Sequence, residues 1–148
     1  LAQRARTVEL PAPAAIGLIS PWVDLSLDGL DETIDDPLLT RAWLEMGAAA
    51  YAGTDRGRPE VSPIRADLTG LPPLFVHGAS DEMFLPDIER FVQAARAAGV
   101  EVTHRRLEGH WHDTHLFAGM VREATEVCQQ MGSWLRGAMD AAGSARRG

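Results

Sequence analysis

Two short apolar runs constrain the fold of this chain more than any other feature of its sequence. Residues 14–20 read AAIGLIS and lie between two prolines, and residues 73–78 read PLFVHG. Neither run alternates between apolar and polar positions, which is typical of strands that are covered on both faces of a sheet. Such strands occur mainly in parallel sheets with helices on both sides, so the sequence predicts an α/β fold.

The segments around these runs complete a repeating strand and helix pattern. Residues 100–107 predict a third strand, which is more polar and therefore nearer the edge of the sheet. Helical spacing of apolar residues predicts helices over residues 40–51, 87–98 and about 114–139, with Thr40 as an N-cap and Gly99 at a helix end. Strands and helices in this order form parallel βαβ units, whose carboxyl ends meet at one edge of the sheet.

Size, charge and cysteine content exclude several classes of protein. The chain has 148 residues, about one domain, and its formal net charge of −7 argues against a nucleic-acid partner. A single cysteine, Cys128, cannot form an intramolecular disulfide. No apolar run approaches the roughly 20 residues that span a bilayer, so we expect no membrane span. No export signal is visible, and we expect a cytoplasmic location.

Polar loops follow the second and third predicted strands. The first, GASDEM at residues 78–83, contains Asp81, and the second, EGHWHD at residues 108–113, contains His112. Because the two strands end at the same rim, a carboxylate and an imidazole are expected to meet there. A carboxylate that orients an imidazole is two thirds of a Ser-His-Asp catalytic triad.

Several motifs together resemble one family. They are LISPWVDL at residues 18–25, VSP at 61–63 leading to LPPLFVHG at 71–78, AGV at 98–100, and the histidine loop. With these motifs the chain resembles the C-terminal half of the hormone-sensitive-lipase-like family of α/β-hydrolases, over residues 1 to about 139. The resemblance implies the C-terminal part of an α/β-hydrolase parallel sheet, with about three strands and flanking helices. Residues 1–140 would form this part of one domain, with residues 21–72 as a cap-like insertion and residues 141–148 as a frayed tail.

The resemblance also assigns candidate catalytic residues. Asp81 falls on the triad acid and His112 on the triad base, while Glu82 is the nearest competitor because some relatives use glutamate in this loop. The family's His-Gly-Gly-Gly and Gly-Asp-Ser-Ala-Gly motifs are absent from the sequence. We therefore expect the serine nucleophile and the oxyanion hole in a preceding part of the parent protein, and we expect this chain alone to be inactive.

The implied function is a serine carboxylesterase that works without a metal or organic cofactor. Its substrate would be a small-molecule ester or lactone. Trp22, Trp43 and Met46 are candidates to line an acyl or alcohol pocket, although ordinary packing explains them equally well, and Trp111 would alter that pocket. The strand at residues 14–20 would expose a pairable edge without its family neighbour, so self-association is expected.

Two other functions are also compatible with the sequence. One is a non-catalytic ligand-binding protein on the same fold, because fold alone does not fix function. The other is a zinc-dependent hydrolase that uses His110, His112 and His115 beside Asp113. The zinc reading is less favoured because the aspartate is displaced by one position from the zinc motif it resembles, and no further histidine follows.

Overall fold

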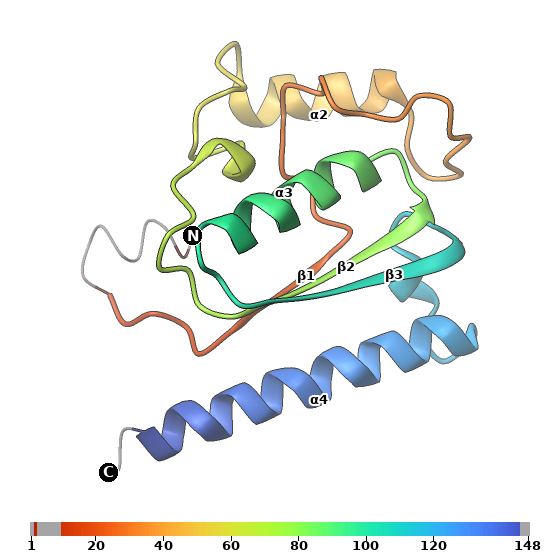
Figure 1. Ribbon diagram of the computed structural model, residues 1–148. Coiled ribbons are helices and arrows are strands. Elements are labelled where there is room, and N and C mark those ends of the chain that lie inside the picture. Colours follow the sequence, from red (N-terminus) through yellow and green to blue (C-terminus); the bar gives the residue numbers. More distant parts are fainter. Residues whose placement is uncertain (1, 3–9, 146–148) are drawn as a thin grey trace.

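The structure is a computed structural model that describes residue 2 and residues 10–145. The sequence LAQRAR at residues 1–6 is typical of the last turns of a helix, but of these residues the structure describes only residue 2. Three parallel strands form one sheet in the order β1-β2-β3 (Figure 1). Their bounds are β1 Ile16–Ile19, β2 Leu74–Asp81 and β3 Val102–Trp111. The α/β prediction, with about three parallel strands, is confirmed.

Helices cover both faces of the sheet (Figure 1). Helix α3 lies on one face and α4 on the other, while α2 lies further out, beyond α3. The helices are α2 Arg41–Ala52, α3 Leu85–Ala97 and α4 Arg122–Ala145, with short 3-10 turns η1 Pro63–Arg65 and η2 Thr114–Phe117. None of the described helices is both long and apolar enough to cross a membrane.

The central strand β2 is buried on both faces, which explains its unalternating sequence. Leu74 and Val76 belong to the same hydrophobic core as Ile88 of α3. On the other face, the Phe75 ring lies edge-to-face with the ring of Trp134 in α4, with ring centroids 5.7 Å apart. The strand therefore needs apolar side chains at successive positions rather than at every second one.

The end of the chain differs from its predicted helix. Residues 114–117 form η2, and α4 begins only at Arg122 and continues through Ala145. Gly119 between them has a φ of 89°, a conformation that glycine adopts without the cost other residues incur. The Thr125 hydroxyl accepts a hydrogen bond from the Gly119 N–H at 2.7 Å. The predicted frayed tail is helical through Ala145, and residues 146–148 lie outside the described range.

The long segment between β1 and β2 is fastened by a buried serine. Ser62 is fully buried, and its hydroxyl accepts from the Leu25 N–H at 2.8 Å and donates to the Arg56 carbonyl at 2.5 Å. It thereby ties the stretch around Leu25 to the stretch around Arg56.

A Ser62→Ala change is expected to lower the free energy of unfolding by about 1–3 kcal/mol, because it leaves a buried N–H and a carbonyl without partners. Urea-induced unfolding measures this loss. The matched control is Ser144→Ala on the exposed end of α4, where the hydroxyl bonds only to the Asp140 carbonyl and little change is expected. Equal losses in the two variants would contradict the assignment.

Candidate active site

The polar loops predicted from the sequence meet at the carboxyl end of the sheet. Glu82 directly follows β2, and His112 directly follows β3. The pairing of β2 with β3 shifts register between Ala79 and Asp81, so the strand ends are irregular here. The Ser80 hydroxyl accepts from the Gly109 N–H at 2.7 Å and joins the two loops.

A carboxylate and an imidazole are paired at this point. His112 Nδ1 lies 2.9 Å from Glu82 Oε2, and Glu82 Oε1 accepts from the Ala79 N–H at 2.7 Å. The Glu82 side chain is fully buried, and that of His112 is 12% exposed. Because a carboxylate only accepts, the neutral imidazole carries its proton on Nδ1 and keeps the lone pair of Nε2 available as a base.

The residue that contacts His112 differs from the acid predicted from the sequence. Asp81 is exposed, and its Oδ1 accepts a hydrogen bond from the Ser80 hydroxyl at 2.5 Å. Consecutive residues of an extended chain point to opposite sides, so when Asp81 faces solvent its neighbour Glu82 turns inward. The structure therefore pairs His112 with Glu82, the other candidate acid of this loop, and not with Asp81.

Two sequence signals favour Glu82. A side chain at Gly78 would place its Cβ 3.1 Å from Glu82 Oε1, so glycine leaves room for this carboxylate. Glu82 also precedes the run from Met83 to Leu85, which is buried throughout, whereas Asp81 follows a polar serine.

Aromatic rings hold the imidazole from the side. The ring of Phe84 lies edge-to-face with His112, with centroids 5.3 Å apart, and it stacks on Trp22 at 5.4 Å. Trp22 Nε1 donates to the Asp24 carbonyl at 2.9 Å, which fixes the outer ring. The orientation of His112 is thus set by Glu82 and by this stack together.

The electrostatic surroundings favour the protonated form of His112. Burial lowers its pKa, but the hydrogen bond to Glu82 and the charges of Asp113, Glu82 and Asp36 outweigh that effect. The net result is a pKa raised above the ordinary value. A base that must hold a proton during a reaction gains from such an environment.

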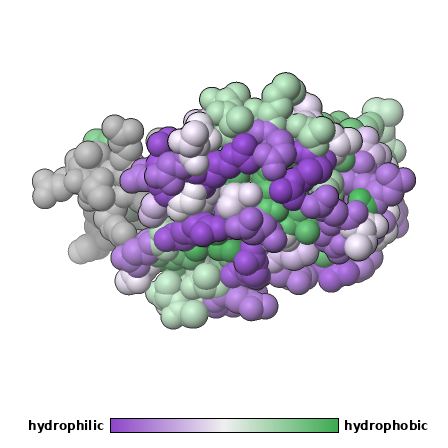
Figure 2. Space-filling model, turned by 90° about the horizontal axis from the view of Figure 1, so that it is seen from above, coloured by the Kyte–Doolittle hydropathy of each residue, from purple (hydrophilic) through white to green (hydrophobic). Residues whose placement is uncertain are grey.

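The four residues predicted to line a substrate pocket lie in different places: some are near His112, and others are exposed on α2. Trp22 reaches His112 through Phe84, and Trp111 lies edge-to-face with Phe117 at 5.8 Å. Trp43 and Met46 are 53% and 64% exposed on α2. Figure 2 looks down on this side of the molecule, where hydrophobic residues are exposed between hydrophilic ones.

The three histidines of the zinc alternative do not converge. His110 Nδ1 lies 2.9 Å from the Glu108 carbonyl, His112 bonds to Glu82, and the His115 ring packs edge-to-face on His77 at 4.2 Å. Within the described part of the chain, no group of three or more His, Cys, Asp or Glu residues is arranged to hold a metal ion.

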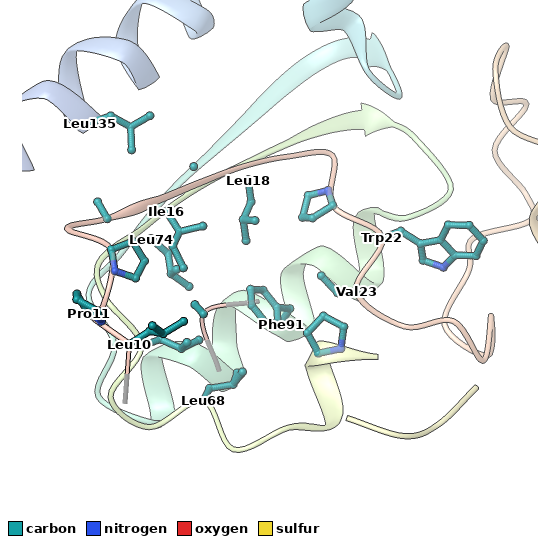
Figure 3. Close-up of a pocket in the computed structure, with 17 residues that line it drawn as sticks. Leu10, Pro11, Ile16, Leu18, Trp22, Val23, Leu68, Leu74, Phe91 and Leu135 are labelled. Carbon is teal, nitrogen blue, oxygen red and sulfur yellow. The ribbon is translucent and has the colours of Figure 1, made fainter. Parts of the chain in front are cut away.

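A large apolar hollow lies beside β1 (Figure 3). Its volume is about 1120 Å³, and its lining includes neither Glu82 nor His112. Trp22 lies at one end of it in Figure 3. The lining is almost wholly apolar, with Ile16, Leu18, Leu68, Leu74 and Phe91 among its residues.

This fold and this pair of side chains are those of an α/β-hydrolase. Comparisons of the chain with known protein families, sequences and structures agree. Residues 1–116 match the alpha/beta hydrolase fold family, and the chain belongs to that family. More narrowly, it is similar to an esterase from the bacterial hormone-sensitive lipase family, whose crystal structure superposes with a TM-score of 0.86 at 31% identity. That match covers 93% of this chain and 48% of the solved one. The chain is therefore hormone-sensitive-lipase-like, as its motifs indicate.

Curated relatives carry related names. An acetyl-hydrolase of Streptomyces hygroscopicus is 37% identical over 138 residues, which cover 90% of this chain and 46% of the relative. Esterase LipU of Mycobacterium tuberculosis is 30% identical, over 92% of this chain and 49% of its own length. The chain thus spans about half the length of the curated relatives it matches.

Proposed function

We propose that this chain supplies the acid and the base of a serine carboxylesterase, with Glu82 as the acid and His112 as the base. The observation that carries the proposal is the 2.9 Å contact between His112 Nδ1 and a fully buried carboxylate. A buried carboxylate in this position selects the imidazole tautomer and stabilises the imidazolium that forms during the reaction. The serine and the oxyanion hole would come from another part of the parent protein, and the chain alone would be inactive.

The proposed reaction has two balanced halves. The serine hydroxyl adds to the ester carbonyl while its proton passes to His112 Nε2, and the tetrahedral intermediate then expels the alcohol, which takes that proton. Water attacks the resulting acyl-enzyme and gives one proton to Nε2. Collapse of the second intermediate releases the carboxylic acid and returns the proton to the serine. Glu82 stays ionised throughout and stabilises His112 whenever it is charged.

Short acyl esters are the proposed substrates. One relative is named an acetyl-hydrolase and others esterases, which supports a small acyl group. Trp22 and Phe84 beside His112 give the site an apolar and aromatic wall, which suits an uncharged ester.

We expect the complete protein that contains this chain to hydrolyse p-nitrophenyl acetate. A fluorophosphonate, which reacts covalently with activated serines, should abolish the activity in proportion to labelling, while EDTA should leave it unchanged because no metal takes part. The measurement is release of p-nitrophenol, with intact-mass detection of the label. Activity lost to EDTA and restored by Zn²⁺ would point to the zinc alternative. Saturable ester binding without turnover would support a ligand-binding protein.

A further inference from the structure

A second carboxylate lies on the other side of the His112 ring. Asp113 Oδ2 is 3.4 Å from Nε2, the nitrogen opposite the one that contacts Glu82. The Asp113 side chain is 39% exposed, whereas that of Glu82 is fully buried. The imidazole thus has a carboxylate at each nitrogen, and only the one at Nε2 is open to solvent.

The backbone of Asp113 is fixed where it stands. Its φ is 51°, in the left-handed region, and its N–H donates to the Ser20 hydroxyl at 3.4 Å. The Ser20 N–H in turn donates to the His77 carbonyl at 2.8 Å, and the Asp113 carbonyl accepts from the Leu116 N–H at 2.9 Å. The position of the carboxylate follows from this anchored turn rather than from a freely moving loop.

We propose that Asp113 is a positioning and specificity-determining residue, whose negative charge beside Nε2 favours protonated His112 and disfavours substrates that carry an anion near the scissile ester. The proposal rests on the proposed function, because it takes Nε2 to be the atom that exchanges protons with serine. The reason is electrostatic: an exposed charge next to the reacting atoms acts on whatever charge a substrate brings there.

The other charged groups around His112 have different roles. Glu82 comes from the end of β2, Asp36 from the segment after β1, and His115 from η2. Glu82 holds Nδ1. Asp36 is buried and accepts from the N–H groups of Leu38 and Leu39 at 2.9 and 3.1 Å. Burial lowers the pKa of His115, which keeps that ring neutral. Asp113 is therefore the carboxylate of this group that an approaching substrate meets.

The test is Asp113→Asn in the complete protein. Asparagine adopts the left-handed conformation and has nearly the same shape, so the variant removes the charge while the backbone contacts remain. The acid limb of the pH profile of kcat/KM should move to lower pH, since protonated His112 loses a stabilising charge. The kcat/KM for monomethyl succinate relative to uncharged methyl pentanoate should rise by roughly three- to tenfold, as expected for two charges several Å apart in a partly solvated site.

Control variants separate charge from structure. Glu108→Gln removes an equal charge from an exposed residue that pairs with Arg106 and should change neither readout. Asp113→Glu should restore the selectivity of the unmodified enzyme. If Asp113→Asn does not fold, the unmodified enzyme still provides a test, because raised salt should screen the charge and increase the relative rate for the anionic ester.

The possible failures are distinguishable. An active Asp113→Asn enzyme with an unmoved acid limb and an unchanged ester ratio would overturn the role of Asp113 and leave the proposed function standing. A ratio that is indifferent to salt in the unmodified enzyme would overturn it as well. If ester hydrolysis were absent, or did not depend on His112, the proposed function itself would fail.

Discussion

A Glu82→Gln variant of the complete enzyme is expected to lose about four orders of magnitude in kcat for ester hydrolysis, the loss seen when a triad carboxylate becomes an amide. Glutamine has nearly the same shape, and its oxygen can still accept from the Ala79 N–H, so the fold should persist. The amide then presents its NH₂ group to His112, which favours the wrong tautomer, and it carries no charge to stabilise the imidazolium. Steady-state rates with p-nitrophenyl acetate and a circular dichroism spectrum measure activity and folding separately.

The matched control for this experiment is Asp81→Asn. Asp81 is the neighbouring acid, but it is exposed and bonded to Ser80, so its variant should keep kcat within a few-fold. A His112→Ala variant, which removes the base itself, should lose at least as much as Glu82→Gln. If Asp81→Asn were the damaged variant and Glu82→Gln the active one, the catalytic acid would be Asp81.

Most of the fold could be predicted from the sequence because a strand that is buried on both faces has an unbroken apolar sequence. A strand such as β2, covered by α3 on one face and α4 on the other, has to be apolar at successive positions, and this pattern is visible without coordinates. The break before α4 was not predicted. Thr114 to Met139 has an apolar stripe at helical spacing, and the stripe continues past Gly119, whose left-handed φ depends on its surroundings.

The sequence favoured Asp81 as the partner of His112, whereas the structure pairs His112 with the neighbouring Glu82. Position along the chain places Asp81 and Glu82 equally well at the end of β2. The choice between them depends on the register shift between Ala79 and Asp81 and on which side chain turns inward, and both are properties of the packed sheet. The room left by Gly78 is a local signal, but it acquires its meaning only once the strand direction is known.

A second large effect is expected from histidines that the catalytic mechanism does not use. His77 in β2 is fully buried, and neither of its ring nitrogens has a hydrogen-bond partner. The same holds for the ring nitrogens of His115, which packs against it at 4.2 Å. Burial, together with the nearby His115, His104 and His110, lowers the pKa of His77 to about 3.

The complete protein should therefore lose stability in mild acid. The pKa of His77 falls from an ordinary 6.5 to about 3 on folding, so between these values the unfolded chain binds a proton that the folded chain excludes. Above about pH 6.5 the exclusion of this proton costs the folded protein no stability. As the pH drops from there toward 3, the free energy of unfolding falls by up to about 1.4 kcal/mol per pH unit for this one group. Urea-induced unfolding at a series of pH values from 7.5 to 4.5 measures this slope.

Replacing His77 by Phe tests whether this histidine causes the slope. Phenylalanine keeps an aromatic ring against His115 and binds no proton, so the variant should lose less stability between pH 6.5 and 4.5 than the unmodified protein does. Some slope should remain, because burial also lowers the pKa values of His104 and His115. Ser144→Ala on the exposed end of α4 is the control, since it removes no ionisable group and should leave the slope unchanged. Equal slopes in the unmodified protein and in His77→Phe would show that β2 tolerates a charge at this position, contrary to the burial that the structure gives it.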